Sequence, residues 1–150
     1  MTHTSHSLEE TAELAKHFVD FVSQNPIHSV FGFSGDLGSG KTAFTQCVAR
    51  ELGITGHITS PTFVIQKKYP IDRDGFPFKT LIHIDAYRLE NGKELLTLDF
   101  KHEFEDSSNL ILIEWPEKVA DVLPAETPIL NFSFISEHVR SVEFPAMMGK

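Results

Sequence analysis

An eight-residue segment at positions 35–42 combines three glycines with a terminal lysine and threonine. A turn with few side chains can present consecutive backbone N–H groups to an anion. The lysine can reach the outer phosphates of a nucleoside triphosphate, and the threonine hydroxyl can coordinate Mg²⁺. The segment therefore predicts a phosphate-binding loop for a nucleoside triphosphate with magnesium. Its residues are Gly35, Asp36, Leu37, Gly38, Ser39, Gly40, Lys41 and Thr42.

A dinucleotide-binding turn is the alternative interpretation of these glycines, because Gly38 to Ala43 also fits the spacing G-x-G-x-x-G/A. Such a site needs an acidic residue about 20 positions later to hold a ribose hydroxyl. Residues 56–61 contain no carboxylate. The lysine and threonine at the end of the segment fit only the triphosphate loop.

A magnesium–triphosphate site also needs a carboxylate at the end of a neighbouring strand, bound to the metal directly or through water. Glu114 follows the apolar run Leu110–Ile113 and Asp85 follows Leu81–Ile84, so both residues are candidates. His83 lies two positions before Asp85 on the same strand face, where it could be structural or functional. The sequence leaves open which of the two carboxylates would position the attacking water in a hydrolysis reaction.

Hydrophobic periodicity predicts the elements that position these residues. A short apolar strand at 29–33 leads into the loop, and a helix from Lys41 to about Leu52 follows it, with Gly53 as its stop. Further helices are predicted at 8–23, 91–104 and 116–122, and strands at 63–69, 80–85, 110–114, 129–135 and 139–144.

These elements predict a single α/β P-loop NTPase domain over residues 1–150. Its central sheet is expected to be mixed and mostly parallel, flanked by helices and extended by antiparallel hairpins. A chain of 150 residues is too short for two independent domains.

Composition limits the partners of the chain. Lysine and arginine total 13 against 21 acidic residues, a net charge of −8, which argues against independent binding to nucleic acid. The apolar runs are too short to cross a bilayer and the N-terminus is polar, so we expect a cytoplasmic protein without a membrane partner. A single cysteine, Cys47, excludes an internal disulfide.

Four motifs in this order resemble one family. They are the loop at 35–42, Ser60-Pro61-Thr62-Phe63, the run from His83 to Leu89, and Glu114-Trp115-Pro116-Glu117-Lys118. Together they resemble the TsaE (YjeE) family of small bacterial P-loop ATPases. The resemblance runs over nearly the whole chain, from the Glu10-Thr11 helix to the last strands.

The resemblance implies a role in forming N6-threonylcarbamoyladenosine beside the anticodon of tRNA. In that family the protein binds ATP and Mg²⁺ at the surface of the TsaB–TsaD pair and hydrolyses ATP to keep that complex turning over. TsaD and TsaB are then the direct partners, and tRNA is reached only through them. This arrangement reconciles the acidic charge with a tRNA pathway.

The resemblance also implies roles for individual residues. Thr11 would contact the nucleotide base from the first helix, and Thr42 with Glu114 would hold Mg²⁺. Thr62 would act as a switch near the γ-phosphate. Asp85 would assist hydrolysis by positioning water or the outer ligands of the metal.

The resemblance also concerns Trp115 and Lys118, and the chain departs from the family pattern at two positions. Trp115 and Lys118 would line the nucleotide or the partner side; core packing is the alternative for Trp115. Ser39 replaces an alanine that is usual in the loop, and Asp99 stands where the family often has glycine, which leaves the geometry of that turn open. Neither departure touches the predicted phosphate or metal contacts.

Two other functions remain open from sequence. A small-molecule kinase of the P-loop class uses the same strand, loop and helix, but 150 residues leave little chain for a lid and an acceptor pocket. A nucleotide-binding scaffold without turnover is the second alternative.

Overall fold

Seven strands form one mixed sheet in the computed structural model, which describes residues 1–56, 58, 66–97 and 100–148. The strands are β1 (Thr2–Ser5), β2 (Val30–Ser34), β3 (Gln66–Pro70), β4 (Thr80–Asp85), β5 (Asn109–Glu114), β6 (Ile129–Ser136) and β7 (Val139–Glu143). The helices are α1 (Leu8–Gln24), α2 (Lys41–Glu51), α3 (Gly92–Thr97), α4 (Phe100–Glu105) and the short 3₁₀ helices η1 (Pro116–Val119) and η2 (Ala146–Met148).

The strand order β1-β7-β6-β2-β5-β4-β3 places the loop-bearing strand β2 at the centre of the sheet. β2 pairs in parallel with β5 and β6, and β4 pairs in parallel with β5. The outer pairs β1–β7, β6–β7 and β3–β4 are antiparallel. The predicted fold class, a mostly parallel sheet with antiparallel hairpins, is confirmed.

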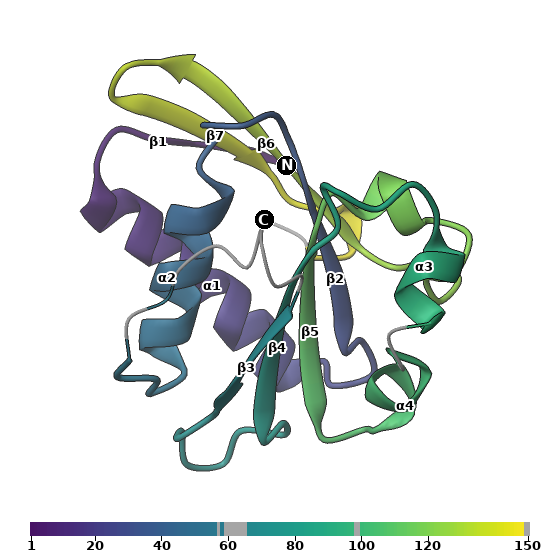
Figure 1. Cartoon of the computed structure of the whole chain (residues 1–150). Helices are drawn as coiled ribbons and strands as arrows, with labels where there is room; N and C mark the ends of the chain where they lie inside the picture. Colours follow the sequence, from purple (N-terminus) through teal and green to yellow (C-terminus); the bar gives the residue numbers. More distant parts are fainter. Residues whose placement is uncertain (57, 59–65, 98–99, 149–150) are drawn as a thin grey trace.

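Helices cover both faces of the sheet, with α1 and α2 on one face and α3 and α4 on the other (Figure 1). Alternate strand residues supply a core to each face. Phe31 and Leu112 pack in the larger cluster with α1 and α2, whereas Ile111 and Ile113 pack in the smaller one with α3 and η1. The central strands are therefore apolar on both faces, as expected of a covered parallel sheet.

Local signals account for the two long helices. Ser7 caps α1 by accepting a hydrogen bond from the Glu10 N–H at 3.1 Å, as the capping pattern predicts. α2 begins directly after Gly40, and Gly53 follows its end with a left-handed φ of 74°. None of the described helices is long and apolar enough to span a bilayer.

The structure differs from the sequence-based expectations at three places. β1 is not predicted, because Thr2–Ser5 is polar and pairs only at the edge, against β7. The region predicted as one helix at 91–104 contains two short helices, α3 and α4, with residues 98–99 outside the described part. The helix predicted at 116–122 is the shorter 3₁₀ helix η1, Pro116–Val119. Residues 63–65 of the strand predicted at 63–69 lie outside the described part, and the rest forms β3.

Candidate functional site

The loop between β2 and α2 requires glycine at its first position. Gly35 has φ 153°, and a Cβ there would lie 2.5 Å from the Phe132 carbonyl oxygen. Gly38 and Gly40 also take positive φ, at 80° and 104°. The loop ends at the N-terminus of α2, where free N–H groups and the helix dipole favour an anion.

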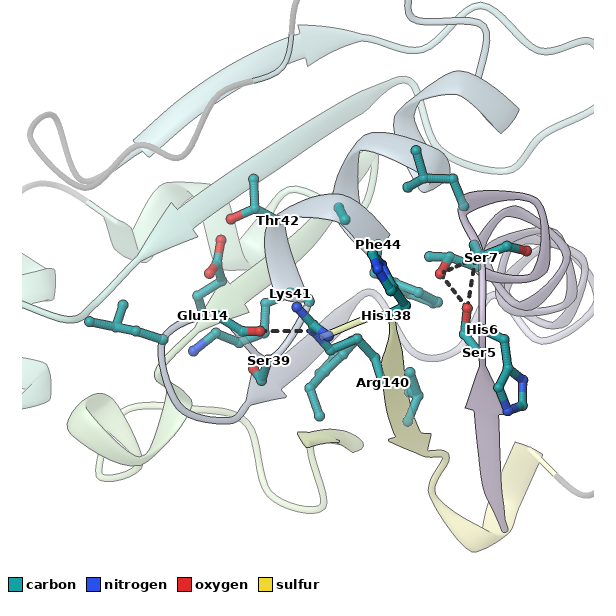
Figure 2. A pocket seen from close by; sticks show the side chains of 18 of the residues that line it. Ser5, His6, Ser7, Ser39, Lys41, Thr42, Phe44, Glu114, His138 and Arg140 are labelled. Atoms are coloured by element: carbon teal, nitrogen blue, oxygen red, sulfur yellow. Dashed lines mark hydrogen bonds between the residues drawn. The ribbon is translucent and has the colours of Figure 1, made fainter. Parts of the chain in front are cut away.

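A cavity of about 570 Å³ opens beside this loop. Figure 2 shows Ser39, Lys41, Thr42 and Glu114 at one end of it and Ser5, His6 and Ser7 at the other. It is therefore built from the loop and α2, the ends of β4 and β5, the start of α1, and the β6–β7 hairpin. The lining residues are Ser5–Leu8, Thr11, Leu37–Phe44, Asp85, Glu114, Trp115, Phe132, Glu137, His138, Arg140 and Val142.

The Lys41 ammonium lies in a poorly solvated position at the loop. Its side chain is 4% exposed, donates to the Gly35 carbonyl and lies 4.0 Å from the centroid of the Trp115 ring. Burial lowers the pKa of Lys41, against the opposing pull of several nearby carboxylates, of which Glu114 and Asp85 are the strongest. A phosphate would return to this cation the charge stabilisation that burial removes.

Trp115 is held over Lys41 by an unusual backbone conformation. Its φ of 62° is left-handed, which few non-glycine residues adopt. Its backbone N–H donates to the Phe33 carbonyl at 3.2 Å, and its ring packs 5.1 Å from that of Tyr87. Strained residues concentrate at functional sites, and this one orients a ring toward the loop lysine.

The two predicted carboxylates meet at the carboxyl ends of adjacent strands. Asp85 and Glu114 are paired in the β4–β5 register and are 5% and 3% exposed. Asp85 accepts a hydrogen bond from the Tyr87 N–H at 2.9 Å. One oxygen of Glu114 lies 2.6 Å from His83 Nε2. Both carboxylates line the cavity that contains Lys41.

The donor set at this end fits a magnesium–nucleotide. No group of three or more His, Cys, Asp or Glu residues in the described part of the chain could hold a metal by itself. Mg²⁺ is usually held by one or two carboxylates together with substrate phosphates, and Glu114 and Thr42 supply a carboxylate and a hydroxyl. The Ser39 hydroxyl is buried without a hydrogen-bond partner in the described residues, so it is available to a ligand.

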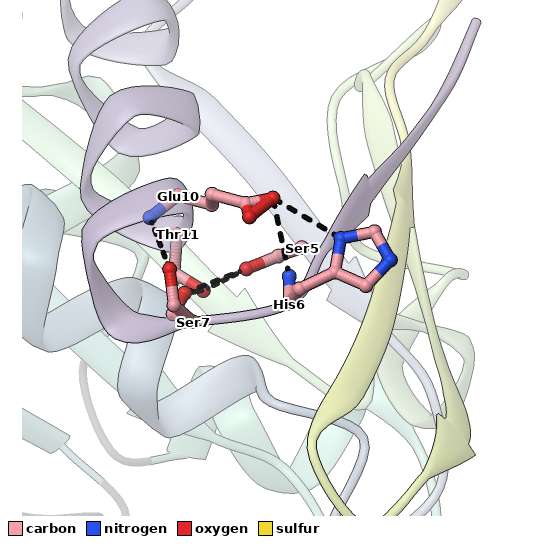
Figure 3. Close-up of polar contacts among 5 residues, drawn as sticks. All are labelled: Ser5, His6, Ser7, Glu10 and Thr11. Atoms are coloured by element: carbon pink, nitrogen blue, oxygen red, sulfur yellow. Dashed lines mark hydrogen bonds and ion pairs between the residues drawn. The ribbon is translucent and has the colours of Figure 1, made fainter.

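The opposite end of the cavity is a small network of hydroxyl groups (Figure 3). Thr11 Oγ1 lies 2.7 Å from Ser5 Oγ and 3.1 Å from the Ser7 carbonyl oxygen, which also accepts from Ser5 Oγ at 2.8 Å. Glu10 contacts the His6 ring at 3.1 Å. β1 thus holds Thr11 of α1 at the cavity wall, and its contact with the nucleotide base stays a prediction.

Arg140 is a cavity residue that the sequence analysis missed. Figure 2 shows its side chain in the cavity. From β7, its Nε donates to the Gly38 carbonyl at 2.9 Å, and a terminal nitrogen donates to the Ser136 carbonyl at 2.7 Å. Its guanidinium lies 4.5 Å from the centroid of the Phe134 ring. A local pattern could predict this hairpin, but only the parallel pairing of β6 with β2 brings it to the loop.

Most predicted site residues lie together, and a few do not. Thr11, the segment from Leu37 to Thr42, Asp85, Glu114 and Trp115 all line the cavity. Gly35 shapes the loop just behind them, as its contact with Lys41 indicates. Asp36 and Lys118 are exposed and are not among the lining residues. Thr62 and Asp99 lie outside the described residues.

Comparison with known proteins identifies close similarity over most of the chain. The family model described as threonylcarbamoyl adenosine biosynthesis protein TsaE matches residues 5–142. The tRNA threonylcarbamoyladenosine biosynthesis protein TsaE of Bacillus subtilis is 36% identical over 139 residues, covering 93% of this chain and 81% of its own. The protein of that name from Haemophilus influenzae is 33% identical over 119 residues, covering 78% and 71%.

A solved structure shares the fold. The crystal structure of Bacillus subtilis YdiB superposes with a TM-score of 0.70 at 28% sequence identity, covering 96% of this chain and 83% of that one. The similarity therefore extends from sequence motifs to the arrangement of the elements.

Proposed function

We propose that this chain, which belongs to the TsaE family, is a magnesium-dependent ATPase in the synthesis of N6-threonylcarbamoyladenosine on tRNA. Relatives in Bacillus subtilis and Haemophilus influenzae carry the name of that pathway. ATP hydrolysis here serves the TsaB–TsaD pair and does not itself transfer the carbamoyl group. The work is done in the cytoplasm, together with those partners.

The observation that carries the proposal is the buried ammonium of Lys41 between a glycine loop and two carboxylates. A lysine that is 4% exposed and whose pKa is lowered by burial is costly in the free protein. Its position at the N-terminus of α2 is where a triphosphate would be held. A stabilising role in the fold would not need a charged group there.

Each residue type then has a separate task. The loop N–H groups and Lys41 bind the phosphates, and Glu114 with Thr42 holds Mg²⁺, which would neutralise charge on the phosphate oxygens. Asp85, beside Glu114 in the register, orients the attacking water. Thr62 is assigned to the γ-phosphate on the family resemblance.

The charge of the chain supports an indirect route to tRNA. A net charge of −8 repels a phosphate backbone, so contact with tRNA runs through TsaB–TsaD. Binding and hydrolysis of ATP would change the geometry of that complex, as in other nucleotide switches. We therefore expect turnover to be slow for the chain alone and faster with the pair.

Phosphate release from Mg-ATP tests the proposal in three arms. The chain is assayed alone, with purified TsaB–TsaD, and with a panel of small-molecule acceptors, with Lys41→Ala as the inactive control. Stimulation by the pair that Lys41→Ala abolishes is the expected result. No stimulation would contradict the proposal, and a phosphorylated acceptor would establish a small-molecule kinase instead. Binding without phosphate release in any arm would indicate a scaffold.

A further inference from the structure

His83 is a buried titratable residue to which the proposed reaction gives no task. Its side chain is fully buried, and its Nε2 lies 2.6 Å from an oxygen of Glu114, which is itself only 3% exposed. This is a short hydrogen bond between two side chains inside the protein. The other ring nitrogen, Nδ1, is buried and has no hydrogen-bond partner among the residues that the structure describes.

Strand geometry explains why the two side chains meet. Side chains alternate along a strand, so His83 lies on the same face of β4 as Leu81, and Glu114 on the same face of β5 as Leu112. Both leucines belong to the core cluster on the α1–α2 face. His83 is paired with Leu112 and Asp85 with Glu114, so the His83 ring reaches Glu114 along a diagonal.

The hydrogen bond fixes the tautomer of His83. A carboxylate only accepts hydrogen bonds, so Nε2 carries a proton and donates a hydrogen bond to Glu114.

A packing role alone does not account for a histidine at this position. The neighbouring residue on the same face, Leu81, fills the core with apolar atoms and leaves no polar atom unsatisfied. Among the described residues, His83 leaves Nδ1 without a partner and contacts Glu114 through Nε2. The ring is therefore best explained by what it does to the carboxylate.

We propose that His83 is a positioning residue that holds one oxygen of Glu114 and thereby orients the other oxygen toward Mg²⁺ at the nucleotide site. This inference rests on the proposed function, since it assigns Glu114 to the metal. Partners that hydrogen-bond a ligating group commonly fix its orientation and raise the metal affinity of the site. His83 contacts neither substrate nor metal in this assignment.

A Mg²⁺ titration of the ADP-bound protein tests the proposal without relying on turnover. Trp115 is the single tryptophan and adjoins Glu114, so its fluorescence reports the site. His83→Leu removes the donor at similar volume, whereas His83→Gln returns an N–H donor near the position of Nε2. Ile82→Val is the matched control, because Ile82 is buried in the same strand but packs on the opposite face.

The expected result is a Mg²⁺ midpoint about tenfold higher in His83→Leu, with His83→Gln restored to within a few-fold of wild type. ADP affinity in EDTA should be the same in all variants, and Ile82→Val should keep the wild-type midpoint. An unchanged midpoint in His83→Leu, equal losses in His83→Leu and His83→Gln, or an equal shift in Ile82→Val would overturn the proposal.

A failure to fold does not remove the test. If His83→Leu is unfolded by circular dichroism, His83→Asn replaces it, because the shorter amide does not reach Glu114. The midpoint should then shift in His83→Asn and not in His83→Gln, and equal midpoints would overturn the proposal. A wild-type protein whose ADP binding is indifferent to Mg²⁺ would instead contradict the proposed function itself.

Discussion

At the scale of single residues, the site concentrates charge that the fold alone does not need. Lys41, Asp85 and Glu114 are each at most 5% exposed, yet they lie around a cavity and not inside the hydrophobic core. Burying ionisable groups costs free energy unless partners compensate for it. We interpret these buried charges as a loss of folding stability that keeps the site preorganised for a charged ligand.

Replacing Lys41 with methionine should separate binding from stability. Burial lowers the pKa of Lys41, so the charged lysine is less stable in the fold than in the unfolded chain. Lys41→Met should therefore abolish nucleotide binding and leave the thermal midpoint of the free protein unchanged or higher, as measured by differential scanning calorimetry. Lys93→Met, at an exposed lysine, is the charge-matched control and should keep binding. A midpoint several degrees lower in Lys41→Met would show that the ammonium is a net stabilising group.

Replacing each carboxylate by its amide should impair a different property: Mg²⁺-dependent binding for Glu114 and phosphate release for Asp85. If Glu114 contacts Mg²⁺, Glu114→Gln should weaken Mg²⁺-dependent nucleotide binding by about tenfold. Asp85→Asn should bind within a few-fold of wild type but lose phosphate release, because it orients water. Binding measured with a fluorescent ATP analogue over a range of Mg²⁺ concentrations distinguishes the two. The opposite ranking would exchange the roles of Asp85 and Glu114.

At the scale of elements, the site depends on segments that are far apart in the sequence. β2, the loop and α2 form one continuous unit, but β7 braces the loop through Arg140 and β1 supplies the wall at Thr11. β1 is in turn an edge strand of the sheet, paired with β7 and joined to the start of α1 by the Ser5–Thr11 contact. The C-terminal hairpin is thus a structural support for the phosphate loop.

Arg140→Ala should therefore weaken nucleotide binding without unfolding the protein. It removes the hydrogen bond to the Gly38 carbonyl, and bonds to charged groups are worth roughly 1.5–3 kcal/mol. If the whole of that range were lost from binding, affinity would fall by about 10-fold to 150-fold. Arg140→Lys keeps the charge but not the planar donor and should resemble Arg140→Ala. Arg50→Ala, at an exposed arginine of α2, is the control; equal affinities in all four proteins would exclude a bracing role.

The attachment of β1 should depend on pH through His3. Burial, with smaller contributions from His17 and the N-terminus, lowers the pKa of His3 below its ordinary value of 6.5, and the ring packs 4.9 Å from that of Phe144. The unfolded chain then binds the proton more readily than the fold. Stability should therefore be complete above pH 6.5 and should fall as the pH drops from 6.5 through the lower pKa of the folded state.

His3→Gln removes this titration and provides the comparison. The thermal midpoint of wild type should fall more between pH 7.5 and pH 5 than that of His3→Gln. His28→Gln, at a histidine that follows the C-terminal end of α1, is the control. Its thermal midpoint should show the wild-type pH dependence. Identical pH dependence in wild type and His3→Gln would contradict the assignment.

At the scale of the whole molecule, features that depend on residues close in the sequence could be predicted, and features that depend on distant residues could not. The phosphate loop is predictable because its chemistry is local: Gly35, Lys41 and Thr42 are within eight positions of one another. The fold class follows from the strand and helix periods. The contacts of Arg140 and of β1 could not be predicted, because they depend on which strands pair, and the pairing of a polar edge strand leaves no periodic signal.

The same reasoning applies to the carboxylates and to His83. Their positions at or near strand ends were visible in the sequence, but the 2.6 Å contact between His83 and Glu114 depends on the parallel β4–β5 register. Sequence alone could therefore name Glu114 and Asp85 as candidates without ranking them. The register makes them neighbours, and the structure shows a histidine partner for Glu114.

Calorimetric titration of ATP into the purified chain tests the central claim most directly, namely that the cavity beside residues 35–42 is a magnesium–nucleotide site. The account predicts one ATP bound per chain with Mg²⁺ present, weaker binding in EDTA, and no binding by Lys41→Met. Absence of binding by the folded wild-type chain, or equal binding by Lys41→Met, would contradict it.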